Sequence, residues 1–398
     1  MRKALIIFFI FFLTLINLSA QNPEDFIIIS VKMDEPSLKN ILMRGNIDVL
    51  MKKDGKLYLL VEKRKLQKFF REGLRFEFPG GEIVPPISKH GLNGAYHSYA
   101  ELERDLFELE KSYPEIAKVF DIGDSWENRN IYAIKISDNV EYDEDEAEVF
   151  FVGCHHAREW ITVEIPYLIA HYLLLNYYQD PEIKWIVDNS EIWIVPLLNP
   201  DGLEYSITTF RYWRKNRRDN GNGSYGVDLN RNYSYMWGCD NIGSSPNPFS
   251  QTYRGPYPFS EPETQAIKNL FEQKNFKVVV SYHSYSQIIL YPWGYTKEPS
   301  PLNDLLEELS SKMSELIYQV NGNLYEFGQG GSFLYLTNGE ATDWFLGTYN
   351  IPAFTIELPP VDFISGGFFN SEEDIIPIFK ENLPAALFLI KWAITTNN

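Results

Sequence analysis

The segment VFFVGCHHAREWITVEIPYLIAHYLLLNYY, which spans residues 149–178, contains a short apolar run, a polar turn and a long apolar run. The first run predicts a buried strand at 149–153, and the second predicts an apolar helix at 160–178. His156 and Glu159 therefore lie on the turn after a strand, at the edge where open α/β sheets bind ligands. One imidazole and one carboxylate in that place suit Zn²⁺, which would still need a third protein ligand and a water molecule.

His283 is the candidate for the third ligand among the six histidines of the chain. It follows the apolar run at 276–282, so it also lies at the end of a predicted strand. The remaining histidines occupy less suitable places in loops, beside the motif or within helices: His90, His97, His155 and His171. A histidine three residues before a glutamate also occurs by chance, so the assignment depends on motifs elsewhere in the chain.

Further motifs follow in the chain: RYWRK at 211–215, GVDLNRN at 226–232, HSYSQ at 283–287 leading to YPWG at 291–294, and FTIEL at 354–358. Together with HAREW at 156–160, they resemble the zinc metallocarboxypeptidases of the pancreatic carboxypeptidase A/B and bacterial carboxypeptidase T type. The resemblance runs from near Tyr96 to near Ile394, with the motifs in the family's order and at closely matching spacing. It implies a peptidase that removes the C-terminal residue of its substrate with the help of one Zn²⁺ ion.

The resemblance assigns three metal ligands: His156, Glu159 and His283. Asp228 would accept a hydrogen bond from the other ring nitrogen of His156 and so fix its tautomer. A base must take a proton from the attacking water and later give it to the leaving amine. The resemblance gives that role to Glu357, at the end of the apolar run 353–356. Arg214 would stabilise the alkoxide that forms on the attacked amide, although a basic run of this kind is otherwise typical of a solvated face.

An exopeptidase must recognise a free C-terminal carboxylate, and the planar guanidinium of arginine binds a carboxylate through two parallel hydrogen bonds. Arg231, helped by Asn230, matches the family's carboxylate clamp. Tyr335 matches the mobile phenol that closes over the substrate. Arg158 would bind the peptide further along, and Tyr285 would line the same groove.

Residues near position 342 would set the choice of C-terminal residue. Thr342 stands where the members that select Lys and Arg carry Asp, so a neutral or aromatic C-terminal residue is expected to be preferred. Gly330 and Gly331 suggest a roomy pocket, because family members often carry bulkier residues there. Glu340 adds an acidic group nearby, as in carboxypeptidase T-like members, and predicts tolerance for Lys and Arg.

The N-terminus predicts export. Arg2 and Lys3 precede an apolar run at 4–18 that leads to Ser19-Ala20, the pattern of a signal peptide at 1–20. The run is short for a membrane span, which needs about 20 residues, and no later segment is long and apolar enough. We therefore expect a protein in the extracellular space or the periplasm, without a stable membrane span.

Residues 21–80 predict a separate small unit, and a linker rich in Pro and Gly follows at 81–95. The expected elements are strands at 26–33, 49–62 (a hairpin turning at Asp54-Gly55) and 74–78, and helices at 35–43 and 63–71. That β-α-β-β-α-β order is typical of a ferredoxin-like α+β sandwich. In size and position the unit resembles the activation segment of procarboxypeptidases, although it carries no matching motif.

The N-terminal part and the rest of the chain carry net charges of opposite sign. Residues 21–89 carry 13 Lys and Arg against 10 Asp and Glu, whereas residues 90–398 carry 21 against 44. Opposite net charges favour docking of the two parts. We interpret the small unit as a pro-segment that covers the cleft until an activating protease cuts the linker. The alternative is a permanent accessory domain.

Residues 96–398 predict one catalytic α/β domain with a central mixed sheet flanked by helices, because strand-like and helix-like runs alternate along it. The net charge of −18 argues against nucleic acid as a partner. Six acidic residues between positions 141 and 148 are typical of a solvated loop, and the alternative is a Ca²⁺ site. We expect a monomer.

Three functions remain open at this point. The first is a secreted zinc-dependent exopeptidase that acts on the C-termini of peptides and proteins. The second is a carboxypeptidase of cell-wall peptides with the same chemistry. The third is a binding protein on the same scaffold that has lost catalysis. Loss of a ligand, of the base or of the carboxylate clamp would mark the third, and the chain retains all of them.

Overall fold

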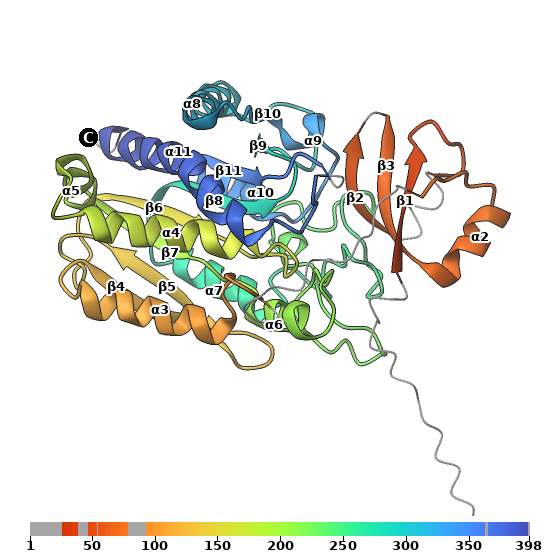
Figure 1. Ribbon diagram of the computed structural model, residues 1–398, viewed down its shortest axis with the longest axis horizontal. Helices are drawn as coiled ribbons and strands as arrows, with labels where there is room; N and C mark the ends of the chain where they lie inside the picture. The colour runs from red at the N-terminus through yellow and green to blue at the C-terminus, as the bar shows by residue number, and fades with distance from the viewer. Residues whose placement is uncertain (1–25, 39–46, 54, 79–92, 363–364, 397–398) are drawn as a thin grey trace, which may run out of the picture.

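The structure is a computed structural model that describes residues 26–38, 47–53, 55–78, 93–362 and 365–396. Its strands form two sheets, one of three strands near the N-terminus and one of eight strands in the rest of the chain. Figure 1 shows the small sheet set to one side of the large one. The signal peptide predicted at 1–20 lies outside the described residues, as do residues 81–92 of the predicted linker.

The large sheet is mixed, as predicted. In spatial order its strands are β10 (Glu326–Gln329), β9 (Ile288–Tyr291), β11 (Ala353–Leu358), β8 (Phe276–Ser284), β6 (Ala147–Val152), β7 (Ser190–Val195), β5 (Asn130–Ile136) and β4 (Ala117–Asp124). The central strands β11, β8, β6 and β7 are parallel, whereas β9 is antiparallel to β11, and β5 to both β7 and β4. The carboxyl ends of the central strands therefore meet at one edge, where sheets of this kind bind ligands.

Helices cover both faces of the large sheet, and this explains the apolar sequences of its central strands. Successive side chains of β6 enter opposite cores: Val149 and Phe151 one, Phe150 and Val152 the other. The first face is covered by α3 (Tyr99–Ser112), α4 (Ile161–Asn176), α5 (Pro181–Val187), α8 (Asn303–Asn321) and α11 (Ile375–Thr396). The second is covered by α7 (Pro262–Phe271) and α10 (Ala341–Tyr349). The predicted α/β architecture is confirmed, and none of the helices in the described residues is long and apolar enough to cross a bilayer.

The segment 149–178 folds as its pattern predicts, with a strand, a turn and a helix. The position directly after β6 requires a glycine, Gly153, because a Cβ there would lie 1.9 Å from the carbonyl oxygen of Thr162, in the first turn of α4. This close approach holds the start of α4 against the strand end and fixes the turn that carries His156 and Glu159. Short helices lie in other loops: α6 (Pro200–Thr208), η3 (Leu229–Arg231), α9 (Gly330–Phe333) and η4 (Glu372–Asp374).

The small unit agrees with most of the predicted α+β order. Its antiparallel sheet has the order β1 (Phe26–Lys32), β3 (Lys56–Glu62), β2 (Asp48–Lys53), and η2 (Lys63–Lys65) and α2 (Leu66–Arg71) follow β3. The strand expected at 74–78 is reduced to one bridge between Ser30 and Glu77. The helix expected at 35–43 falls largely on residues outside the described ranges.

The small sheet meets the large part of the chain through one apolar cluster. Ile28, Tyr58 and Leu60 project from one face of the small sheet and pack in this cluster with Tyr285 and Phe368. Further members of the cluster are Ala157, Phe210, Tyr212 and Trp213. Because Tyr285 directly follows β8, the small unit rests beside the carboxyl edge of the large sheet (Figure 1).

Candidate metal centre

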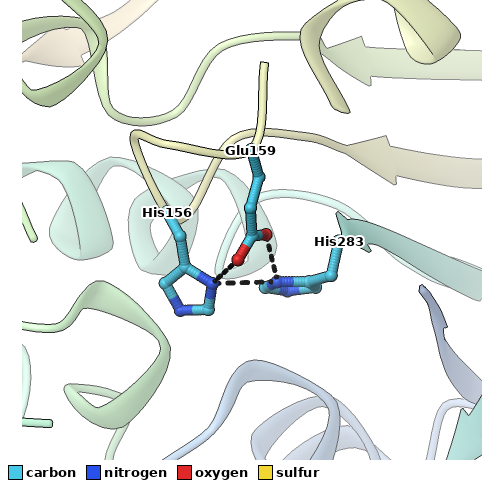
Figure 2. Close-up of side chains that lie close together, drawn as sticks. All are labelled: His156, Glu159 and His283. Carbon is cyan, nitrogen blue, oxygen red and sulfur yellow. Dashed lines mark hydrogen bonds and ion pairs between the residues drawn. The ribbon is translucent and has the colours of Figure 1, made fainter. Parts of the chain in front are cut away.

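Two distant segments of the chain place three metal-binding side chains at one point. His156 and Glu159 lie on the turn after β6, and His283 is the penultimate residue of β8. Strands β6 and β8 are parallel neighbours, with Val152 paired to Ser281, so their carboxyl ends lie side by side. Figure 2 shows the three side chains converging from the turn and from the strand.

The geometry of the three side chains fits a divalent cation. Nδ1 of His156 lies 2.8 Å from Oε1 of Glu159, and Nδ1 of His283 lies 3.1 Å from Oε2 of the same carboxylate. The two Nδ1 atoms are 3.2 Å apart, so two lone pairs would repel each other unless a cation or a proton lies between them. All three residues are at least 96% buried. Two nitrogens and one oxygen in an enclosed site are the donor set that catalytic zinc prefers.

Asp228 connects this cluster to Arg214. Its Oδ1 lies 3.2 Å from Nε2 of His156, and its Oδ2 accepts hydrogen bonds from Nε and Nη2 of Arg214 at 3.0 and 2.9 Å. Burial alone would raise the pKa of Asp228, but the charges of Arg214 and His156 hold it well below its usual value. The carboxylate therefore keeps the proton of His156 on Nε2 and leaves Nδ1 as the metal-binding nitrogen.

Ser281 is a partner that the sequence analysis missed. Its Oγ lies 3.1 Å from Nε2 of His283, the ring nitrogen that does not face the cluster. A hydrogen bond there orients the second imidazole as Asp228 orients the first. The signal was present in the sequence, because residues i and i+2 of a strand share a face, and Ser281 precedes His283 by two positions.

Glu357 lies on the strand next to His283. The two residues are paired across the parallel strands β11 and β8. Burial, together with the negative charge of Glu159, raises the pKa of Glu357 to about 8, although His283 and Arg214 act in the opposite direction. A carboxyl group whose pKa lies near neutrality can both accept and return a proton, which is the property required of a general base and acid.

Comparison with known proteins identifies the family. Residues 102–385 match the description of the zinc carboxypeptidase peptidases. The chain belongs to the zinc carboxypeptidase family. It is 36% identical over 294 residues to a carboxypeptidase B of Astacus astacus, covering 72% of this chain and 93% of that protein. It is also 32% identical over 400 residues to a zinc carboxypeptidase of Saccharothrix mutabilis subsp. capreolus, covering 93% and 90%.

Comparison with solved structures agrees with this family assignment. The crystal structure of carboxypeptidase A from Helicoverpa armigera superposes with a TM-score of 0.73 at 25% identity. The match covers 94% of this chain and 96% of that one, so it extends beyond the large sheet. The chain is therefore a metallocarboxypeptidase, a hydrolase of a zinc-dependent family.

In this carboxypeptidase, one of the residues expected to bind the substrate carboxylate contacts the metal centre, because Nδ2 of Asn230 lies 3.5 Å from Nε2 of His283. Arg231 is buried, and its guanidinium is held by the carbonyl oxygens of Gly243 and Asn230 at 3.0 and 2.6 Å. The side-chain oxygen of Asn230 accepts from the amide of Ala341 at 2.9 Å, which anchors the loop before α10. Tyr335 is 49% exposed, as a phenol that closes over a substrate would be.

Arg158 and Tyr285 both contact the ring of Phe368. The guanidinium of Arg158 is 4.1 Å from the ring centre of Phe368, and the ring of Tyr285 packs against Phe368 at 4.8 Å. Both residues are buried in the full chain. Tyr285 and Phe368 belong to the apolar cluster that also receives Tyr58 and Leu60 of the small unit, and Arg158 contacts this cluster through Phe368.

The predicted specificity residues form a hydrogen-bonded group around Glu340. Its two carboxylate oxygens accept from the hydroxyls of Thr342 and Thr337 at 3.1 and 2.6 Å. Burial and the charge of Glu340 raise the pKa of the neighbouring Asp343 well above its usual value. Asp343 accepts hydrogen bonds from the amides of Gly294 and Tyr295.

Position 331 requires a glycine for a reason different from the one we expected. A Cβ at this position would lie 2.3 Å from the carbonyl oxygen of Thr296, so the glycine is required by close backbone packing. At Gly330, in contrast, the nearest atom to an added Cβ is 3.7 Å away, and the position has room. Only one of the two glycines therefore fits the expectation of a roomy pocket.

The acidic loop contributes to two carboxylate groups. Asp138, Glu144 and Glu146 lie close enough together to share an ion, and burial raises the pKa of Glu146 to about 7. The other group consists of Asp143, Glu148 and Glu191, and it is neutralised by Lys274, which pairs with all three, and by Lys135, which pairs with Glu191. A Ca²⁺ site stays a prediction for the first group alone.

Proposed function

We propose that this zinc carboxypeptidase is an exported exopeptidase that removes neutral or aromatic C-terminal residues from peptides and proteins and tolerates Lys and Arg. The observation that supports it most strongly is the placement of Glu357 beside His283, at the edge where the three candidate ligands converge. Peptides that differ only in a C-terminal Phe, Leu, Arg or Glu test the preference through kcat/KM. Fastest turnover of the peptide ending in Glu would overturn it.

Each residue has a physical role in this proposal. His156, Glu159 and His283 would hold zinc, which when bound polarises the scissile carbonyl and lowers the pKa of the attacking water. Glu357 would take the proton from that water and deliver it to the leaving amine nitrogen. Arg214, oriented by its ion pair with Asp228, would face the negative charge that develops on the carbonyl oxygen.

Recognition of the C-terminus would depend on Arg231. Its guanidinium is already oriented by two backbone carbonyls, so little conformational entropy is lost when a carboxylate binds. Tyr335 would close over the bound residue. Burial raises the pKa of its phenol, although the charges of Arg231 and Arg214 act in the opposite direction.

The tolerance for basic residues is expected to depend on Glu340. Glu340→Gln removes the charge but keeps groups that can hydrogen-bond to Thr337 and Thr342. We expect kcat/KM on a peptide ending in Arg to fall about tenfold, and that on a peptide ending in Phe to stay within about twofold, since roughly 1.4 kcal/mol corresponds to tenfold. An equal loss on both peptides would show that the variant disturbs the site as a whole.

We also propose that the small N-terminal unit restricts access to the site. Ile28, Tyr58 and Leu60 share an apolar cluster with Tyr285 and Phe368, next to the proposed peptide groove. The opposite net charges of the two parts favour this docking. Lys89, in the linker, offers trypsin a place to separate them.

Cutting the linker is expected to raise kcat/KM at least about tenfold, because a larger fraction of the molecules then has a site that the substrate can reach. Leu60→Asp in the uncut chain should raise activity as well, since it buries a charge in the apolar contact. Gln67→Asp, on the exposed side of α2, is the matched control and should change nothing. Equal rates before and after cutting would instead identify a permanent accessory domain.

Cell-wall peptides remain the second candidate substrate. Parallel digestion of a linear peptide and of a cell-wall peptide, followed by mass spectrometry, separates the two candidates directly. We expect hydrolysis of the linear peptide, because Arg214, Asn230 and Arg231 match the set that ordinary carboxypeptidases use. Hydrolysis of the cell-wall peptide alone would reverse the assignment.

A further inference from the structure

The segment 62–75 of the small unit is strongly basic. It spans η2, α2 and the turn that follows, and it carries six Lys and Arg against two Glu. The basic residues, which we call the basic face, are Lys63, Arg64, Lys65, Lys68, Arg71 and Arg75. All of them except the half-buried Lys65 are exposed.

The basic face lies on the opposite side of the small sheet from the large part of the chain. Leu59 and Val61 of β3 pack in one apolar cluster with Phe69 of α2. The alternate residues of the same strand, Tyr58 and Leu60, project to the other face and pack against the large part. Figure 1 shows α2 on the outer side of the small sheet, away from the large sheet. The basic face is therefore turned away from the contact between the two parts.

Most of this positive charge is not neutralised within the described chain. Glu62 pairs with Arg64 and Lys65, which belong to the same segment. Four members of the basic face form no ion pair with another described residue: Lys63, Lys68, Arg71 and Arg75. With six positive and two negative side chains, the segment keeps a net charge of +4. A surface of this kind attracts an anionic partner from outside the chain.

An exposed aromatic ring beside the basic face indicates the kind of anionic partner. Phe70 lies between Lys68 and Arg71 in the sequence of α2 and is 73% exposed, whereas Phe69 is only 6% exposed. A soluble anionic polymer would bind the charges but would leave the ring in water. A bilayer with anionic lipids offers a negative surface and also an apolar boundary in which an aromatic ring can be buried. The combination therefore favours a bilayer.

We propose that the basic face and Phe70 dock the chain on a bilayer surface that contains anionic lipids. Each Lys or Arg near such a surface strengthens binding about fivefold, and clusters of about four to eight of them are typical of proteins that bind there. The inference goes beyond the proposed function and does not depend on it, because it concerns binding to a surface and not hydrolysis.

The docking fixes the orientation of the chain. The small unit would lie between the bilayer and the large part, since the basic face and the contact with the large part are on opposite sides of the small sheet. Residues 90–398 carry 21 Lys and Arg against 44 Asp and Glu, so an anionic bilayer repels them. A separation greater than about 8 Å, the screening length at physiological ionic strength, largely removes that repulsion.

Sedimentation with lipid vesicles tests the docking. The chain without residues 1–20 is used, so that the apolar run at 4–18 cannot bind the bilayer, and it keeps every described residue. We expect at least about tenfold stronger binding to phosphatidylcholine vesicles with about 30% phosphatidylglycerol than to vesicles of phosphatidylcholine alone. The difference should disappear in about 0.5 M NaCl, because salt screens the charges. Equal binding to both kinds of vesicle, or binding to neither, would overturn the proposal.

Two double variants with the same change in net charge separate the basic face from the overall charge. Lys68→Glu with Arg71→Glu should weaken binding to the anionic vesicles at least about tenfold. Lys111→Glu with Lys312→Glu changes exposed side chains of α3 and α8 and should alter binding less than about twofold, since distant charges are screened. Equal losses in the two double variants would assign the binding to net charge alone and would contradict the proposal.

Phe70→Ser distinguishes a bilayer from a soluble polyanion. We expect binding to the anionic vesicles to weaken at least about threefold, because the apolar contact of the ring is lost, and binding to polyphosphate to stay unchanged. Unchanged vesicle binding by Phe70→Ser, or tight binding to polyphosphate with none to vesicles, would identify a soluble polyanion as the partner instead. None of these measurements uses hydrolysis, so a failure of the proposed function would not affect them.

Discussion

Glu357→Gln is expected to lower kcat by at least about 10²-fold without loss of zinc, which is the usual contribution of a general base. The substitution keeps the size of the side chain but removes its ability to take a proton from the attacking water. The residue lies opposite His283 on the neighbouring strand, and burial keeps its pKa raised to about 8. Turnover of a peptide ending in Phe, measured together with the zinc content, checks the prediction.

The pH profile of the same variant adds an independent check. A base works only when it is deprotonated, so kcat/KM of the unmodified chain should rise with pH through the pKa of Glu357. The positive charge of bound zinc favours the carboxylate, so this rise should lie below about pH 8. The rise should be absent in Glu357→Gln and retained in Glu326→Gln, which changes an exposed carboxylate of β10. A full rise in Glu357→Gln would assign the base elsewhere.

His283→Ala is expected to abolish zinc retention and with it peptide hydrolysis. The substitution leaves one imidazole and one carboxylate, and a catalytic zinc site commonly requires three protein ligands. Chelation followed by return of Zn²⁺ should restore activity to the unmodified chain but not to the variant. Metal analysis after dialysis and the rate on a peptide ending in Phe are the measurements.

Two further variants show whether the effect of His283→Ala comes from loss of a zinc ligand or from a general disturbance of the fold. Asp228→Asn disturbs the partner of His156 but keeps all three ligands, so zinc should bind about 10- to 100-fold more weakly and zinc occupancy should return at high zinc concentration. His171→Ala, in α4 away from the cluster, should bind zinc normally. If His283→Ala retained zinc as tightly as Asp228→Asn, His283 would not be a ligand.

Features that depend on neighbouring residues were predicted correctly from the sequence, whereas features that depend on distant segments were not. Residues 149–178 gave a correct strand, turn and helix, because apolar periodicity acts within a few residues. The strand expected at 74–78 was wrong in extent, since its length depends on the strand with which it pairs. Gly331 was misinterpreted for a related reason, because the carbonyl oxygen of Thr296 that excludes a side chain comes from another loop.

The sequence by itself determined the types of residue available for chemistry and their local settings: an imidazole and a carboxylate on a turn after one strand, an imidazole at the end of another, and a glutamate at the end of a third. Only the tertiary structure decided that β8 lies between β6 and β11, so that His283 meets His156 on one side and Glu357 on the other. The order of strands depends on packing between residues at least 74 positions apart in the sequence, and no local pattern encodes that order. The same packing made the ion pair of Asp228 with Arg214.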